Sequence, residues 1–215
     1  MVFVAVVLEI YWVRGYFAIG IDQASKAGNV GNLIRTAHAF GASFVFAVNP
    51  KVVAHTGELV TKDFTDTSKS HQQIPFFNYL TAADVDVPQG CQIVGIEITE
   101  DAVDLPSFKH PTQAIYVLGG ERSSLSADML ARCDSTIKIP SKFSLNVATA
   151  GAIVMYDRHR VLGGYPDRPL MTGAKPETKP AHVHGGVRNR HVSKADRVAA
   201  EAKRVGVLPR DAKGG

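Results

Sequence analysis

Polar side chains of three kinds follow three strands that we predict in this chain. Arg35 provides a cation, Glu121 a carboxylate, and Ser144 and Asn146 a hydroxyl and an amide. Because ligands of open parallel sheets bind beside the carboxyl ends of the strands, we expect these loops to form one polar site. Taken singly, Arg35 could also be a solvated surface residue, and Glu121 an ordinary acid at a helix start.

The segment 139–156 contains two of these residues and has an unusual pattern. A strand ends at Pro140, a short polar turn follows, and the helix after it has no charged residue before Asp157. An exposed helix shows a polar stripe, so we expect this one to be buried nearly all round. Ser144 and Asn146 stand in its first turn beside free backbone N–H groups, where they could line a ligand site or serve only as helix caps.

Strands and helices alternate between residues 15 and 162. We expect strands at 16–21, 43–48, 92–98, 114–118 and 136–139, and helices at 30–40, 127–132 and 145–156. Asn29 is expected to cap the first helix and Gly41 to end it. This alternation predicts an α/β fold with a parallel sheet and helices on both faces.

Composition divides the chain into three parts. Residues 1–14 form an apolar extension, 15–166 the α/β domain, and 167–215 a basic tail that we expect to be mostly disordered. From Arg168 onward there are eleven Lys and Arg against four Asp and Glu, although the net charge of all 215 residues is only +4. A basic excess confined to one segment indicates a nucleic-acid partner, with a passive solvated extension as the alternative.

The sequence gives little support for a metal site, a disulfide or a membrane span. Cys91 and Cys133 lack metal-binding spacing, so we expect buried free thiols in a reducing cytoplasm. Three histidines of the tail (His182, His184 and His191) fit a flexible segment better than a metal site. The apolar residues 1–13 are too short to span a bilayer, which needs about 20 residues, and we expect neither a membrane span nor a metal.

The three polar loops together carry a family resemblance. The pattern Asn29-Val-Gly-x-x-x-Arg35-Thr-Ala-x-Ala-Phe-Gly41-Ala42 resembles the first motif of the SpoU/TrmH family. Gly119-x-Glu121 with Leu125-Ser126 resembles the second motif, and Ile139-Pro140 with Ser144-Leu145-Asn146-Val147 the third. The motifs occur in order over residues 15–162. The chain therefore resembles the RNA 2′-O-ribose methyltransferases of the SPOUT superfamily, although many members have glycine at the position of Ser124.

This resemblance implies a Rossmann-like sheet with a C-terminal deep trefoil knot, a homodimer, S-adenosylmethionine as the cofactor, and tRNA or rRNA as the substrate. It implies that Arg35 is the catalytic arginine. It also implies that Asn29 and Glu121 shape the site and hold the Arg35 side chain. Ser144 and Asn146 would line the catalytic centre. The implied cofactor-binding residues are Ile96, Gly119, Gly120, Ile139, Ser144 and Leu145. The alternative is an RNA-binding protein of the same fold that has lost catalysis.

Overall fold

The computed structural model describes residues 15–51, 73–121, 123–166 and 168–176. The chain separates into two compact units, Met1–Asp167 and Arg168–Gly215, and the fold described below is that of the first. The expected extension at 1–14 and the tail beyond residue 176, with its three histidines, lie outside the described residues. Among those that are described, no helix combines the length and hydropathy needed to cross a membrane.

The described residues form a parallel sheet of seven strands in the order β3-β2-β1-β6-β4-β7-β5. The strands are β1 (Tyr16–Asp22), β2 (Val45–Val48), β3 (Phe76–Tyr79), β4 (Gln92–Ile96), β5 (Val103–Asp104), β6 (Gln113–Leu118) and β7 (Ser135–Lys138). The helices are α1 (Ala27–Ala39), α2 (Ala127–Arg132) and α3 (Val147–Leu162), with 3-10 turns η2 (Ala82–Asp84) and η3 (Leu105–Ser107). The predicted parallel α/β sheet is confirmed, and its five expected strands agree within two residues.

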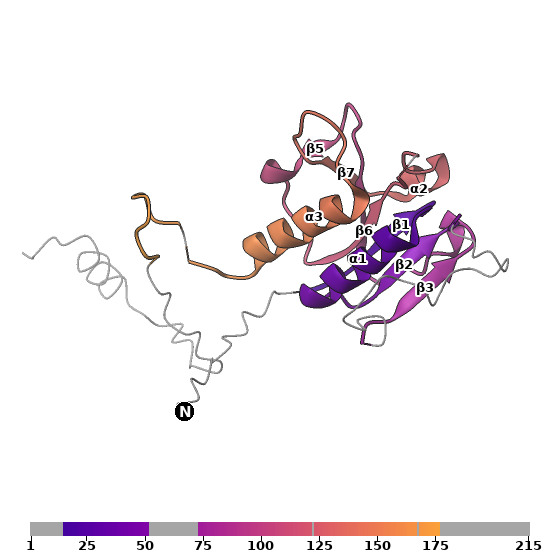
Figure 1. The fold of residues 1–215 in the computed structure, drawn as a ribbon, viewed down its shortest axis with the longest axis horizontal. Helices are drawn as coiled ribbons and strands as arrows, with labels where there is room; N and C mark the ends of the chain where they lie inside the picture. Colours follow the sequence, from indigo (N-terminus) through magenta and orange to yellow (C-terminus); the bar gives the residue numbers. More distant parts are fainter. Residues whose placement is uncertain (1–14, 52–72, 122, 167, 177–215) are drawn as a thin grey trace, which may run out of the picture. The chain divides into compact units, whose positions relative to one another are not determined.

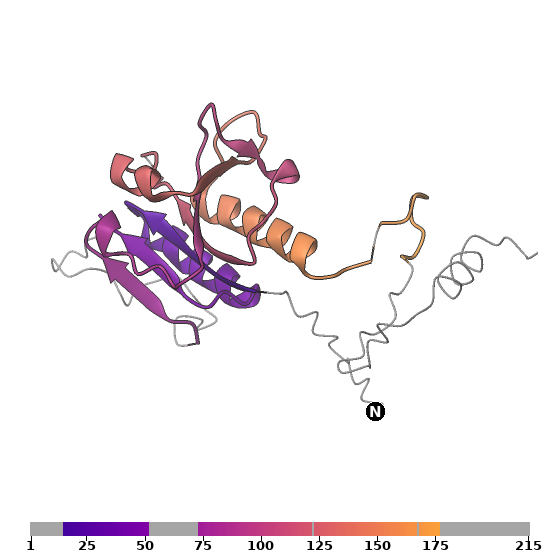
Figure 2. The same ribbon diagram turned by 180° about the vertical axis from the view of Figure 1, so that it is seen from behind.

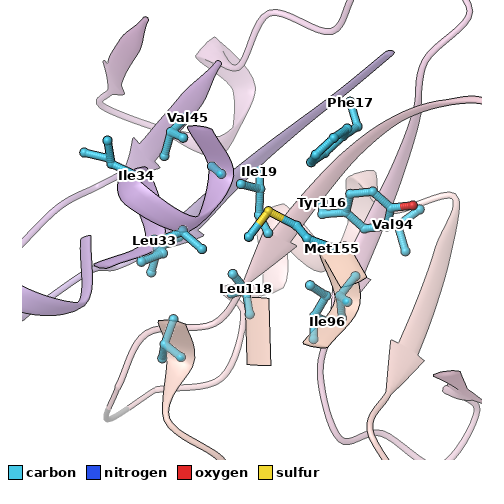
Figure 3. Close-up of a cluster of buried hydrophobic side chains, with 14 of the residues drawn as sticks. Phe17, Ile19, Leu33, Ile34, Val45, Val94, Ile96, Tyr116, Leu118 and Met155 are labelled. Carbon is cyan, nitrogen blue, oxygen red and sulfur yellow. The ribbon is translucent and has the colours of Figure 1, made fainter. Parts of the chain in front are cut away.

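Helices α1 and α3 pack against each other on one face of the sheet (Figure 1). Their apolar side chains, among them Leu33 and Met155, gather around Ile19 of the inner strand β1 (Figure 3). Gly151 of α3 lies so close to α1 that a Cβ there would come within 2.6 Å of Leu33 Cδ1. Figure 2 shows the molecule from behind. A second buried cluster, on the opposite face of the sheet, includes Met129 of α2 and Ala82 of η2. Burial on both faces explains why the central strands are almost uninterrupted apolar runs.

The start of α1 differs from the prediction. The helix begins at Ala27 after Lys26, which makes no side-chain cap, so the expectation that Asn29 caps it is wrong. Asn29 is the third helical residue and is buried, and its amide bonds to side chains from two other segments. The expected end is confirmed: Gly41 has φ +73°, a left-handed conformation that glycine adopts without steric cost.

Helix α3 begins at Val147, and Asn146 caps it. The Asn146 Oδ1 atom accepts hydrogen bonds from the backbone N–H groups of Ala148 at 3.0 Å and Thr149 at 3.3 Å. The expectation of burial nearly all round is wrong for the single chain, because Thr149 and Tyr156 are exposed on one side of the helix, Tyr156 by 55%. The missing charges of α3 therefore do not reflect burial within one chain.

A buried arginine fixes the second half of α3 to the amino-terminal edge of the sheet. Arg158 is 1% exposed and donates to the carbonyl oxygens of Pro111 at 2.6 Å, Thr112 at 2.9 Å and Tyr16 at 3.4 Å. Its guanidinium also lies 5.1 Å from the centre of the Phe17 ring. These contacts hold α3 across β1 and β6, so that the capped start of the helix meets the opposite, carboxyl-terminal edge.

Candidate active site

Three loops at the carboxyl-terminal edge are joined through the Glu121 carboxylate. Glu121 Oε2 accepts hydrogen bonds from the backbone N–H and the hydroxyl of Ser25, at 2.9 and 2.5 Å. Its Oε1 accepts from Asn29 Nδ2 at 2.8 Å. Asn29 Oδ1 in turn accepts from Asn146 Nδ2 at 3.1 Å, and Asn146 caps α3. We call Ser25, Asn29, Glu121 and Asn146 the carboxylate network.

The charge of Glu121 is stabilised by these donors. Partial burial alone would raise the pKa of Glu121, but the hydrogen bonds from Ser25 and Asn29 outweigh it and hold the pKa below the ordinary value. The carboxylate is therefore ionised at neutral pH. Because it accepts three hydrogen bonds from the neighbouring loops, we assign it the role of orienting these loops and not that of transferring protons.

The structure brings together three of the five residues implied for catalysis. Asn29, Glu121 and Asn146 belong to the carboxylate network, and Ser144 lies on the wall of the adjoining cavity. Arg35 is exposed on α1 and makes no hydrogen bond or ion pair with the described part of the chain. The implied contact of Asn29 and Glu121 with Arg35 is therefore not formed. Instead, both side chains bond to each other.

A cavity of about 350 Å³ lies beside the network. All six residues that the resemblance implies for cofactor binding line it. Its apolar wall consists of Ile96, Ile98, Leu118, Ile139, Leu145, Val147 and Ala150. Its polar wall includes Glu97, Glu121, Ser123, Ser124, Lys138, Ser141 and Ser144. The cavity thus combines an apolar surface with a few convergent polar groups, as small-molecule sites usually do.

The paired glycines let the loop after β6 approach its neighbours closely. A Cβ on Gly119 would come within 3.0 Å of Glu97 Oε2, and one on Gly120 within 2.6 Å of the Gln23 carbonyl oxygen. Gln23 itself has φ +56°, so the β1–α1 loop is bent tightly at this contact. Ser124, at a position where many members have glycine, does not need a left-handed backbone. Its side chain is accommodated at the cavity wall.

Sequence reasoning missed Ser25, Glu97 and Asp22. Asp22 is 1% exposed at the end of β1, and its Oδ2 accepts from the Ser126 N–H at 2.7 Å, which ties β1 to the start of α2. Polar residues at or just beyond the ends of buried strands were the available signal, because Asp22 ends β1, Ser25 lies in the loop after it, and Glu97 follows β4. Their partners lie 28 to 104 residues away, so their contacts could not be read from local patterns.

Two further expectations concern thiols and metals. Cys91 and Cys133 are free, as expected, but each is only partly buried. Burial raises the pKa of the Cys133 thiol to about 11, so it is protonated and unreactive at neutral pH. Within the described ranges, no group of three His, Cys, Asp or Glu residues is arranged to hold a metal ion.

The sequence profile of the SpoU rRNA methylase family matches residues 16–156. The chain belongs to this family. The match contains β1 through most of α3, and with them the carboxylate network and every residue of the cavity wall. Family membership therefore rests on the part of the chain that builds the candidate site.

Relatives of known name are 26–29% identical to this chain over the aligned residues. The tRNA (guanosine(18)-2′-O)-methyltransferase of Escherichia coli strain K12 is 28% identical over 146 residues, which are 65% of this chain and 61% of that protein. The enzyme of the same name from Thermus thermophilus is 29% identical over 166 residues, covering 70% of this chain and 79% of its own. The mouse protein TARBP1, also named as this methyltransferase, is 28% identical, but the match covers only 9% of it.

Solved structures share the fold. The SpoU methyltransferase AviRb from Streptomyces viridochromogenes, crystallised with AdoMet, superposes with a TM-score of 0.58 at 22% identity. The superposition covers 68% of this chain and 58% of AviRb. The superposition shows that AviRb and this chain have the same fold.

Proposed function

We propose that this protein transfers a methyl group from S-adenosylmethionine to a ribose 2′-hydroxyl of tRNA or rRNA. The observation that carries the proposal is the cavity beside the carboxylate network, lined by all six implied cofactor residues in a chain of the SpoU family. Relatives named for tRNA guanosine 18 and for 23S rRNA uridine 2479 support both RNA classes. The alternative is a catalytically inactive RNA-binding protein. Measuring the binding of S-adenosylmethionine distinguishes it from a methyltransferase.

The cavity suits S-adenosylmethionine in size and chemistry. Its volume of about 350 Å³ lies in the range of roughly 300–1,000 Å³ that small-molecule sites occupy. Ile96, Leu118 and Leu145 offer an apolar surface to an adenine ring, and the close backbone at Gly119 and Gly120 offers hydrogen-bonding groups. When bound, the cofactor would supply a methyl group activated on a sulfonium.

The residues of the chain would mainly position and activate the accepting oxygen. Arg35, exposed and unpaired within the described residues, is available to grip an RNA phosphate or orient the ribose 2′-hydroxyl and favour loss of its proton. Glu121 and Asn29 would set the position of α1, on which Arg35 stands. Ser144 and Asn146 would form the polar edge of the catalytic centre, with Asn146 held by Asn29.

Family membership also supports a homodimer and a deep trefoil knot in the C-terminal part of residues 15–166. The exposed apolar side of α3 around Tyr156 supports the dimer, because a second chain would cover it. The segment between β7 and α3, which carries Ser144 and Leu145, is where we place the knotted crossing. The cytoplasm, where RNA is modified and thiols stay reduced, remains our prediction for the location.

Calorimetry with S-adenosylmethionine and S-adenosylhomocysteine tests the cofactor directly. We expect both to bind at one site per chain, whereas ATP, which has adenosine without the methionine part, binds far more weakly. A folded protein that binds neither methyl donor nor product would contradict the proposal and favour the inactive RNA-binding alternative.

A further inference from the structure

Glu97 is a cavity carboxylate to which neither the sequence motifs nor the network assigns a role. It follows β4, and its backbone N–H donates to the Ile137 carbonyl at 3.0 Å, which extends the ladder with β7. Its Oε2 accepts from the Leu125 N–H at 2.8 Å, and its Oε1 accepts from the Ile98 N–H at 3.0 Å. Two backbone groups therefore fix the carboxylate in one orientation at the cavity wall.

The Glu97 carboxylate keeps capacity to accept more hydrogen bonds. A carboxylate offers about four acceptor positions on its two oxygens, and the two backbone donors occupy two of them. No Lys or Arg of the described residues forms an ion pair with it. Glu121, the other carboxylate of the wall, already accepts three bonds from Ser25 and Asn29. Glu97 is thus the carboxylate left for a ligand's donors.

Sheet order separates the two carboxylates. Glu121 bonds to the β1–α1 loop, on the side of the sheet where α1 and Arg35 lie, whereas Glu97 follows β4 beside β7. The wall next to Glu97 contains three isoleucines, Ile96, Ile98 and Ile139. Lys138 also lines it, and its Nζ donates to the Thr99 carbonyl at 3.3 Å. A ligand spanning the cavity with its reacting group at the Glu121 end would place an apolar ring near these isoleucines. Glu97 would then meet the part joined to that ring.

We propose that Glu97 accepts hydrogen bonds from the ribose 2′- and 3′-hydroxyls of S-adenosylmethionine. Two neighbouring hydroxyl donors match two carboxylate oxygens, and bonds to an ionised acceptor are among the stronger ones. The inference rests on the proposed function, since it names the group that recognises the cofactor's ribose. Glu97 is a specificity residue here and takes no part in the transfer itself.

The test compares Glu97→Gln with Glu100→Gln, which makes the same change of charge at an exposed residue outside the cavity wall. The amide introduced by Glu97→Gln keeps an oxygen for the Leu125 N–H and replaces the other carboxylate oxygen by an NH₂ donor. Circular dichroism checks that each variant is folded. Affinities are measured by calorimetry for S-adenosylhomocysteine, for 5′-methylthioadenosine, which lacks the amino acid part, and for 2′,3′-dideoxy-5′-methylthioadenosine.

We expect Glu97→Gln to weaken binding of the first two ligands roughly tenfold to a hundredfold and to leave the dideoxy ligand unaffected. Glu100→Gln should change none of the three. An equal loss for methylthioadenosine and its dideoxy counterpart would overturn the ribose contact. A loss confined to S-adenosylhomocysteine would overturn it too, and would assign Glu97 to the ammonium group. Failure of the unsubstituted protein to bind S-adenosylhomocysteine would instead contradict the proposed function itself.

Discussion

At the scale of single residues, the Glu121 carboxylate links the loops after β1 and β6, and through Asn29 it reaches the start of α3. All three of its donors are neutral, so the negative charge is stabilised by oriented dipoles instead of by a cation. Arg35 is consequently left unpaired within the described residues. In this arrangement the negative charge of Glu121 orients the loops of the site. The positive charge of Arg35 can then bind a phosphate of the proposed RNA substrate.

Glu121→Gln tests the organising role. The amide nitrogen of glutamine would face either the two Ser25 donors or the Asn29 donor, so the free energy of unfolding should fall by about 1–3 kcal/mol. Because the folded pKa of Glu121 lies below its ordinary 4.5, the stabilisation is complete above that pH and is lost as the pH falls through the folded pKa.

Urea unfolding of both proteins at pH 7 and at pH 3 measures this difference, with exposed Glu100→Gln as the control. The gap between the original chain and Glu121→Gln should narrow at the lower pH. Equal stability of the two at pH 7 would show that the network does not hold the loops together.

At the scale of elements, α3 joins the two edges of the sheet. Asn146 ties its start to the site, and Arg158 ties its second half to carbonyl groups at the opposite edge. Its apolar residues are only partly used within one chain, since Tyr156 remains 55% exposed and Val161 44%. This exposed apolar side is the surface on which we propose that a second chain packs.

If the proposed dimer forms through this face, Tyr156→Glu should convert it into a monomer, because the new charge would be buried without a partner. Analytical ultracentrifugation over a range of protein concentrations measures the mass. Leu130→Glu is the matched control, since Leu130 is 36% exposed on α2, which covers the other face of the sheet. A Tyr156→Glu protein that sediments like the original chain would place the dimer interface elsewhere.

The elements show what a sequence can and cannot predict. Buried apolar runs such as Ala114–Leu118 and the α1 spacing of Val30, Leu33 and Ala37 predicted the sheet and its first helix, because one-dimensional periodicity reports burial directly. The site was predicted as a meeting of three loops. The pairing within it was not, because Asn29 looks like a cap locally and its true partner Glu121 lies 92 residues away.

At the scale of the whole molecule, charge is distributed unevenly between the two units. Residues 1–167 carry a net negative charge, and the excess of Lys and Arg begins at Arg168. A negatively charged domain would by itself repel RNA, so for the proposed RNA substrate we expect the basic unit to supply much of the affinity for the phosphate backbone.

Deletion of residues 168–215 should weaken RNA affinity and flatten its dependence on salt, while S-adenosylhomocysteine affinity changes little. Filter binding of tRNA and rRNA fragments at several salt concentrations measures both effects, because each lost phosphate contact lowers the slope by about 0.7–0.9. Unchanged slope and affinity would make this unit a passive extension.

The central claim is methyl transfer to a ribose oxygen at a site that Arg35 serves. The most direct measurement incubates the protein with unmethylated tRNA and rRNA and labelled S-adenosylmethionine, and maps the labelled nucleotides after digestion. We expect label on ribose 2′-oxygens, and a loss of roughly a hundredfold or more with Arg35→Ala, whose cofactor affinity and dimer mass stay unchanged. Label on a base, no label at all, or full activity of Arg35→Ala would contradict the account.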